Sequence, residues 1–97
     1  MNAIEADRSM LATILDLPVA AIPVPCFTPE TTDEPYWQVH NGEEGGLELS
    51  VVRDEGTVCL MLYNGDDSIF LYDSAARHFG RAFIQLVKDE FGGNDNV

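Results

Sequence analysis

Apolar residues recur with helical spacing near both ends of the chain and alternate with polar residues in between. The first pattern predicts a helix over residues 3–17, which Pro18 ends because proline cannot continue a helix. The second covers about 73–91, where apolar side chains fall at i, i+3, i+4 and i+7, and Gly92 and Gly93 follow as a stop signal.

The central part of the chain predicts short strands joined by tight turns. The segments 47–53, 57–63 and 68–72 are rich in β-branched and aromatic residues, and 36–40 is a fourth candidate. We therefore expect an α+β fold with an N-terminal helix and a proline-rich extended segment over 18–35. An antiparallel meander of three to four strands and a C-terminal helix packed on one sheet face complete it.

The alternation in the two longest strands decides which side chains share a face, because a slip of one residue moves every side chain to the other side. A three-residue loop at 54–56 would place polar residues of one strand opposite aliphatic residues of the other. An even loop that pairs Arg53 with Gly56 places aliphatic residues opposite each other. We favour the even loop, which pairs Leu47, Leu49 and Val51 with Leu62, Leu60 and Val58. A following loop of two or four residues adds Ile69 and Leu71 to this face, where the C-terminal helix should pack.

The opposite face of the predicted sheet is too apolar to be left wholly to water. We expect something to cover this face. The candidates are the N-terminal helix, the proline-rich segment, a second copy of the chain in a homodimer, and a partner protein. If a partner or a second copy covers it, the candidate contact residues are Met61, Tyr63, Phe70 and Tyr72.

Charge is the unusual part of the composition, since seventeen acidic and five basic residues give a net charge of −12 over 97 residues. Nucleic acid and anionic membranes would repel such a chain, so the expected partner is a protein with a basic surface. The hydrophobic content of 45% is that of a folded protein. We expect one acidic domain over 1–97 with a frayed tail at 94–97.

The chain shows no targeting or membrane signal. No stretch approaches the roughly 20 apolar residues of a membrane span, and the start lacks the basic and apolar regions of a secretory signal. A cytoplasmic location is expected, with Cys26 and Cys59 as reduced core or strand residues.

Patterns that carry catalysis or cofactor binding are not found. The acids of 53–56 and 63–73 lack the ligand spacing of a calcium loop, and His40 and His78 have no nucleophile pattern nearby. The glycine-rich 41–46 lacks the lysine and the following helix of a phosphate loop. We expect no catalytic residue, no metal and no cofactor, and not an enzyme.

The acids concentrate in the predicted turns. Alternate turns of a meander fall at one end of the sheet, so 41–46 and 64–67 should share a rim. The expected partner-binding acids of this rim are Glu43, Glu44, Asp66 and Asp67. Tyr36 and Trp37 beside it are candidate aromatic anchors, with a place in the core as the alternative for Trp37. A solvated acidic surface without a partner is the alternative for the rim.

These features favour a small acidic inhibitor that acts by binding protein. In size, acidity and lack of catalytic motifs the chain resembles phage anti-defence proteins, including anti-CRISPRs and DNA mimics. The resemblance implies a partner whose basic nucleic-acid-binding surface is blocked, with association that weakens in salt.

The alternative is a chaperone or immunity-type module that shields one cognate protein. Small acidic secretion chaperones of mixed helix and sheet are similar to this chain in composition. The contact would then be the apolar sheet face, and salt would weaken it little.

Overall fold

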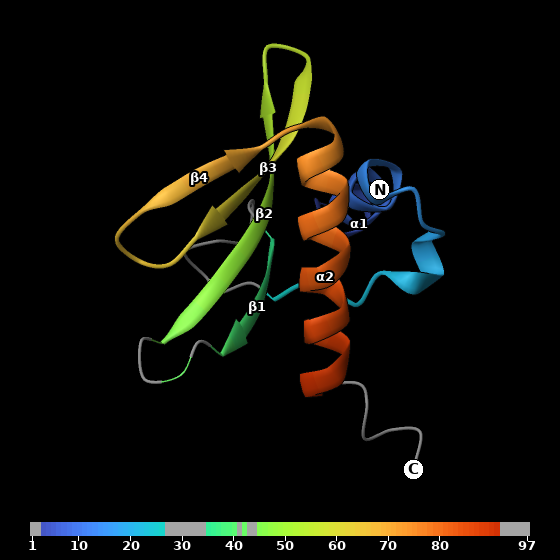
Figure 1. The fold of residues 1–97 in the computed structure, drawn as a ribbon. Coiled ribbons are helices and arrows are strands. Elements are labelled where there is room, and N and C mark those ends of the chain that lie inside the picture. The colour runs from blue at the N-terminus through green and yellow to red at the C-terminus, as the bar shows by residue number, and fades with distance from the viewer. Residues whose placement is uncertain (1–2, 27–34, 41, 43–44, 92–97) are drawn as a thin grey trace.

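A computed structural model describes residues 3–26, 35–40, 42 and 45–91 of the chain. Its elements are α1 (Ala3–Leu15), the short 3-10 helix η1 (Val19–Ala21), β1 (Tyr36–His40), β2 (Gly46–Asp54), β3 (Thr57–Tyr63), β4 (Ser68–Leu71) and α2 (Asp73–Phe91) (Figure 1). The four strands form one antiparallel sheet in the order β1-β2-β3-β4. The predicted α+β fold is confirmed, with all four candidate strands present.

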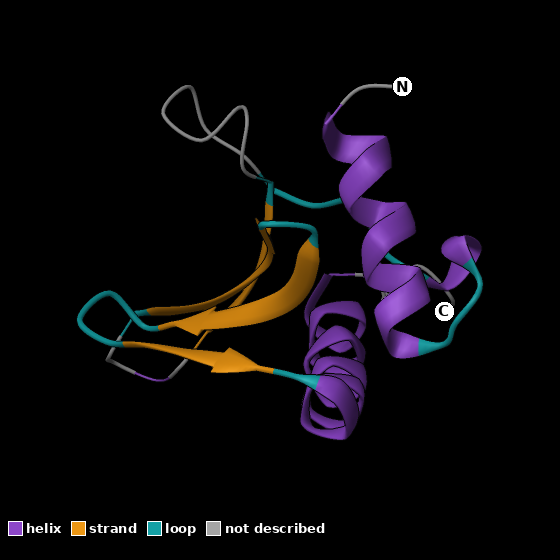
Figure 2. Ribbon diagram, turned by 90° about the horizontal axis from the view of Figure 1, so that it is seen from above, coloured by secondary structure: helices purple, strands orange, loops and turns teal. Residues whose placement is uncertain are grey.

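Both helices lie on the same side of the sheet (Figure 2). The buried side chains between them form one cluster, which includes Leu11 and Leu15 of α1, Trp37, Leu49 and Leu60 of the sheet, and Phe83 and Ile84 of α2. Gly80 of α2 permits this close packing, because a Cβ there would overlap Leu15 and lie 3.0 Å from Leu60 Cδ1. α2 therefore packs on the sheet as predicted, but Phe79 and Leu86 of its predicted apolar stripe are exposed, at 62% and 51%.

The β2–β3 hairpin has the predicted faces but a different pairing. Asp54 pairs with Thr57, whereas the sequence favoured a pairing of Arg53 with Gly56, so that prediction is wrong by two residues. Glu55 and Gly56 form the turn with φ values of 50° and 82°, which suit a type I′ hairpin turn. A shift of two residues keeps each side chain on its face, so one aliphatic face still results.

The proline-rich segment is only partly extended. Val19–Ala21 form the η1 turn, and the Arg8 guanidinium donates to the Ile22 carbonyl at 2.7 Å directly after it. Cys26 pairs with Tyr36 across the free edge of β1, with N···O distances of 2.6 and 3.0 Å. Residues 27–34 of this segment lie outside the described part of the chain.

Three of the five basic side chains hold the fold together. Arg8 holds the chain after η1, and Arg53 pairs with Asp7 of α1. Arg81 reaches from α2 to α1, where its Nε donates to the Leu15 carbonyl at 2.7 Å and so caps the end of that helix. No helix within the described ranges combines the length and the apolar character needed to cross a membrane.

Candidate protein-binding face

The side of the sheet turned away from the helices, which we call the outer face, is not covered by either helix (Figure 2). Strand pairing sets its rows, since Met61 lies opposite Ser50 on one side and Phe70 on the other. Its members include Tyr36, Gln38, Glu48, Ser50, Val52, Cys59, Met61, Tyr63, Ser68, Phe70 and Tyr72. The N-terminal helix, one candidate for its cover, packs on the opposite side.

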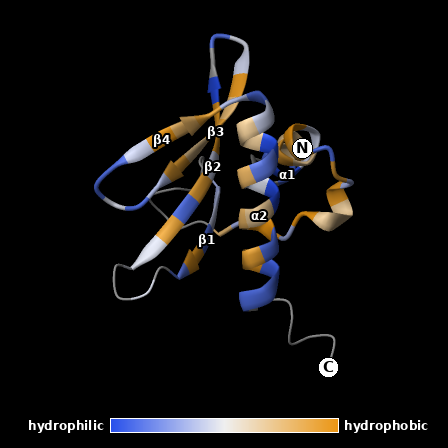
Figure 3. Cartoon of the chain, in the orientation of Figure 1, coloured by the Kyte–Doolittle hydropathy of each residue, from blue (hydrophilic) through white to orange (hydrophobic). Residues whose placement is uncertain are grey.

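Aromatic side chains on this face are exposed to solvent. Phe70 is 50% exposed, Tyr72 53% and Tyr63 37%, while Met61 between them is half-buried and Cys59 is buried. Apolar colour follows β3 and β4 and gives way to hydrophilic residues at their connecting loop (Figure 3). Neighbouring exposed aromatics of this kind are typical of a surface that meets a partner.

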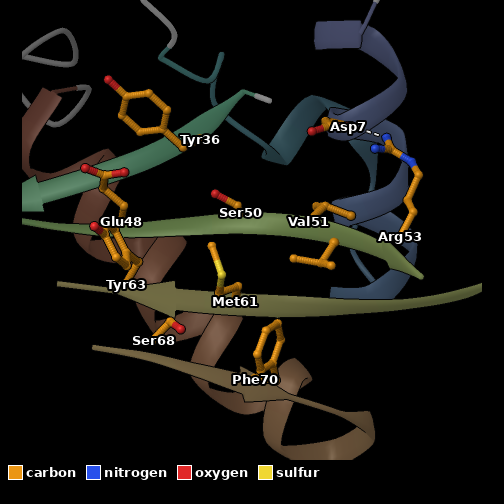
Figure 4. Close-up of a pocket in the computed structure, with 11 residues that line it drawn as sticks. Asp7, Tyr36, Glu48, Ser50, Val51, Arg53, Met61, Tyr63, Ser68 and Phe70 are labelled. Carbon is orange, nitrogen blue, oxygen red and sulfur yellow. Dashed lines mark hydrogen bonds and ion pairs between the residues drawn. The ribbon is translucent and has the colours of Figure 1, made fainter. Parts of the chain in front are cut away.

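Two hollows cross the outer face. The larger, of about 630 Å³, runs from Tyr36 and Glu48 past Met61 to Phe70, with the Asp7–Arg53 pair at its far end (Figure 4). The smaller, of about 380 Å³, lies between Val52, Cys59, Phe70 and Tyr72. Phe70 lines both hollows, so it lies between them on the edge strand β4.

The larger hollow has a negative electrostatic character. Glu48 lines it beside Tyr36 and lies opposite Tyr63 in the β2–β3 pairing. Burial raises the pKa of Tyr36, and Coulombic interactions with Cys26 and Glu48 raise it further. A cationic side chain entering this hollow near Tyr36 would meet Glu48, whereas Arg53 at the far end is paired with Asp7.

The loop between β3 and β4 extends this negative character to the end of the face. Asp66 and Asp67 are exposed, and both of their backbone N–H groups donate to Asn64 Oδ1, at 2.9 and 2.8 Å. The Tyr63 hydroxyl donates to the Gly65 carbonyl at 3.2 Å, which ties the loop to the outer face. The two carboxylates are therefore held at the rim rather than folded into the core.

The expected acidic rim is described only in part. β1 and β2 are connected at the same end of the sheet as β3 and β4, because His40 pairs with Gly46 and Tyr63 pairs with Ser68. This topology agrees with the expectation that the two acidic loops share an end. Glu43 and Glu44 lie outside the described residues, so their part in the rim stays a prediction.

The two candidate aromatic anchors differ in their environments. Trp37 is 1% exposed, and its indole N–H donates to the Pro23 carbonyl at 2.9 Å. Trp37 therefore belongs to the core, which was the alternative stated from the sequence. The prediction that it anchors a partner is wrong, because its side chain has almost no exposed surface to offer. Tyr36 is half-buried and lines the larger hollow.

The described residues contain no group of three or more His, Cys, Asp or Glu side chains that could hold a metal ion. Cys26 is exposed and Cys59 is buried, and both are free thiols. His40 hydrogen-bonds Glu90 through Nδ1 at 3.0 Å, and His78 is exposed on α2. Glu48 was not predicted as a site residue. The sequence did carry a signal for it, because Glu48 lies four residues before Val52 on the same strand and therefore on the same face.

Comparison with protein-family models, with curated proteins and with solved structures finds no significant match to this chain.

Proposed function

We propose that this chain is a small inhibitor that binds a partner protein through its outer face. The observation that carries the proposal is a sheet face, covered by neither helix, that bears half-exposed Phe70 and Tyr72 together with Glu48, and that ends at the carboxylates of Asp66 and Asp67. Aromatic side chains supply contact area, and carboxylates at the border select a basic partner.

The proposed partner is a protein that uses a basic surface to bind nucleic acid. The net charge of −12 favours such a surface, and three of the five bases make contacts within the fold, which leaves little positive charge to oppose it. By occupying the basic surface, the chain would exclude the nucleic acid. This role involves no catalysis and belongs to the cytoplasm, where Cys26 and Cys59 stay reduced.

A chaperone or immunity-type module is the second candidate. The exposed aromatics favour it, because an apolar patch can shield a cognate protein without any charge complementarity. The two candidates differ in their response to salt, since screening weakens contacts between exposed charges and leaves apolar contacts largely intact.

Affinity purification with the tagged chain, followed by mass spectrometry and binding measurements with the purified partner, tests the proposal. The inhibitor predicts a basic nucleic-acid-binding partner, displacement of its bound DNA, and loss of binding when Glu43, Glu44, Asp66 and Asp67 are changed to lysine. Asp89→Lys on α2 is the control for a charge reversal away from the rim, to be compared with Asp66→Lys alone.

A partner that binds the chain and DNA at once would refute the inhibitor. Binding that resists salt but is lost in Tyr63→Ser would favour the shielding module instead. Leu86→Ser, at a residue 51% exposed on α2, is the control for that variant.

A further inference from the structure

The two edge strands of the sheet, β1 and β4, differ in how far their outward backbone groups are hydrogen-bonded within the described residues. In an antiparallel pair, residues alternate between those that exchange hydrogen bonds with the partner strand and those that turn their N–H and C=O groups the other way. Cys26 and Tyr36 exchange both bonds, so Tyr36, Gln38 and His40 turn their backbone groups to the outside of β1.

The β1 edge is largely occupied. Tyr36 is paired with Cys26, and the His40 N–H donates to the Glu90 carboxylate of α2, at 3.1 Å to Oε2 and 3.3 Å to Oε1. Gln38 alone turns outward between these two contacts. A strand approaching this edge would meet Cys26 at one end and α2 at the other, so the edge is protected.

The β4 edge is open in the described structure. The Asn64 N–H donates to the Asp67 carbonyl at 3.1 Å. This bond determines which residues of β4 direct their backbone groups toward β3 and which direct them outward. Ile69 and Leu71 therefore bond to β3, and Ser68 and Phe70 turn their N–H and C=O groups to the outside. Both residues are exposed, and Ile69 is 54% exposed on the other face of the strand.

Charge argues against a second copy of this chain at the β4 edge. Asp66 and Asp67 stand before the strand and Asp73 follows it. Antiparallel pairing of Phe70 with its own copy would put Asp67 opposite Asp73, and each copy carries a net charge of −12. The same acids would attract lysine or arginine side chains.

We propose that β4 receives an extended, basic segment of a partner protein as a fifth strand, with its apolar side chains beside Phe70 on the outer face. Strand addition supplies backbone hydrogen bonds from Ser68 and Phe70, and alternate side chains supply specificity. The inference rests on the proposed protein-binding function and names the form of the partner. It predicts that recognition depends on the backbone of the bound segment as well as on its charge.

NMR with the 15N-labelled chain and a synthetic peptide of alternating lysine and valine tests this. The peptide should shift the amide signals of Ser68 and Phe70 saturably and slow their hydrogen exchange, and leave Gln38 unchanged. A peptide with glutamate in place of lysine, and one with every amide N-methylated, should each bind at least tenfold more weakly.

The protein variant Ser68→Pro removes an outward N–H at the first residue of an edge strand, where proline is tolerated. It should weaken binding at least fivefold, whereas Ser68→Ala, which keeps the N–H, should stay within twofold. The absence of saturable shifts at β4 would overturn the inference, as would dimerisation of the chain without peptide in sedimentation experiments. Shifts confined to Tyr36, Glu48 and Met61, unaffected by Ser68→Pro, would overturn strand addition while leaving the proposed protein-binding function in place.

Discussion

The buried carboxylate of Asp7 in α1 pairs with the guanidinium of Arg53 near the end of β2. The Asp7 side chain is 3% exposed and that of Arg53 44%, so the acid depends on this base more than the base depends on the acid. The Arg53 Nε also lies 3.0 Å from Met10 Sδ, which gives α1 a second contact with the same side chain. The pair therefore fixes α1 on the helical side of the sheet.

Replacing Arg53 by methionine should destabilise the fold by about 1–3 kcal/mol, because it leaves the Asp7 carboxylate buried without its partner. Partial exposure of Arg53 keeps this below the cost of breaking a fully buried pair. Adding Asp7→Leu should restore part of the loss. Urea denaturation of the single and double variants measures this, with Arg77→Met as an exposed control expected to change little. Additive losses in the double variant would contradict the coupling.

Gly80→Ala should lower the free energy of unfolding by about 1–3 kcal/mol, although alanine favours a helix by about 1 kcal/mol over glycine. The reason is steric, since the added Cβ would overlap Leu15. Ala82→Gly, at an exposed position of the same helix, measures the propensity effect alone. If Gly80→Ala gains what Ala82→Gly loses, α1 does not approach α2 as closely as described.

The sequence predicted the faces of the sheet because period-two alternation survives a shift of two residues. It did not predict the pairing of Asp54 with Thr57, since that depends on the positive φ of Glu55, and glutamate carries no signal for it. The sequence also did not determine on which side of the sheet α1 packs. An amphipathic stripe shows that a helix buries one face without showing which surface it meets.

The candidate site was predictable in part for a similar reason. The parity of Met61, Tyr63, Phe70 and Tyr72 placed them on the outer face from the sequence alone. The contact between His40 and Glu90 joins residues 50 apart, and no local pattern indicates it. The same holds for the burial of Trp37 over Pro23, because aromatic residues serve cores and interfaces alike.

The carboxyl of Glu90 should titrate below its ordinary pKa of 4.5, because the His40 side chain hydrogen-bonds it in the folded protein. A folded-state pKa below the unfolded one means that this contact stabilises the fold above about pH 4.5, and that its contribution is lost as the pH falls through the lowered value. In His40→Ala the pKa of Glu90 should move back toward 4.5, with the backbone N–H keeping part of the effect. NMR titration of the Glu90 side-chain carboxyl carbon measures it, and an unchanged pKa in that variant would contradict the contact.

Changing Asp66 and Asp67 together to asparagine should slow association with the partner by roughly two- to tenfold at low salt, since these exposed carboxylates would steer encounter with a basic surface. The dissociation rate should change less, and the salt dependence of association should decrease. Stopped-flow kinetics over a range of salt concentrations give both rates. Asp89→Asn on α2 should leave them unchanged, and an equal effect of that variant would mean that only the overall charge matters.

The most direct test of the outer face as the binding surface compares the partner affinities of Phe70→Ser and Phe79→Ser by calorimetry. The two residues are of one type and similarly exposed, at 50% and 62%, but Phe70 lies on the outer face and Phe79 on α2. We predict that Phe70→Ser weakens binding by at least about tenfold, as expected for an exposed aromatic side chain that lines both hollows, and that Phe79→Ser leaves it within about twofold. Weakening by Phe79→Ser with full binding by Phe70→Ser would contradict the account, because it would move the partner to the helical side of the protein.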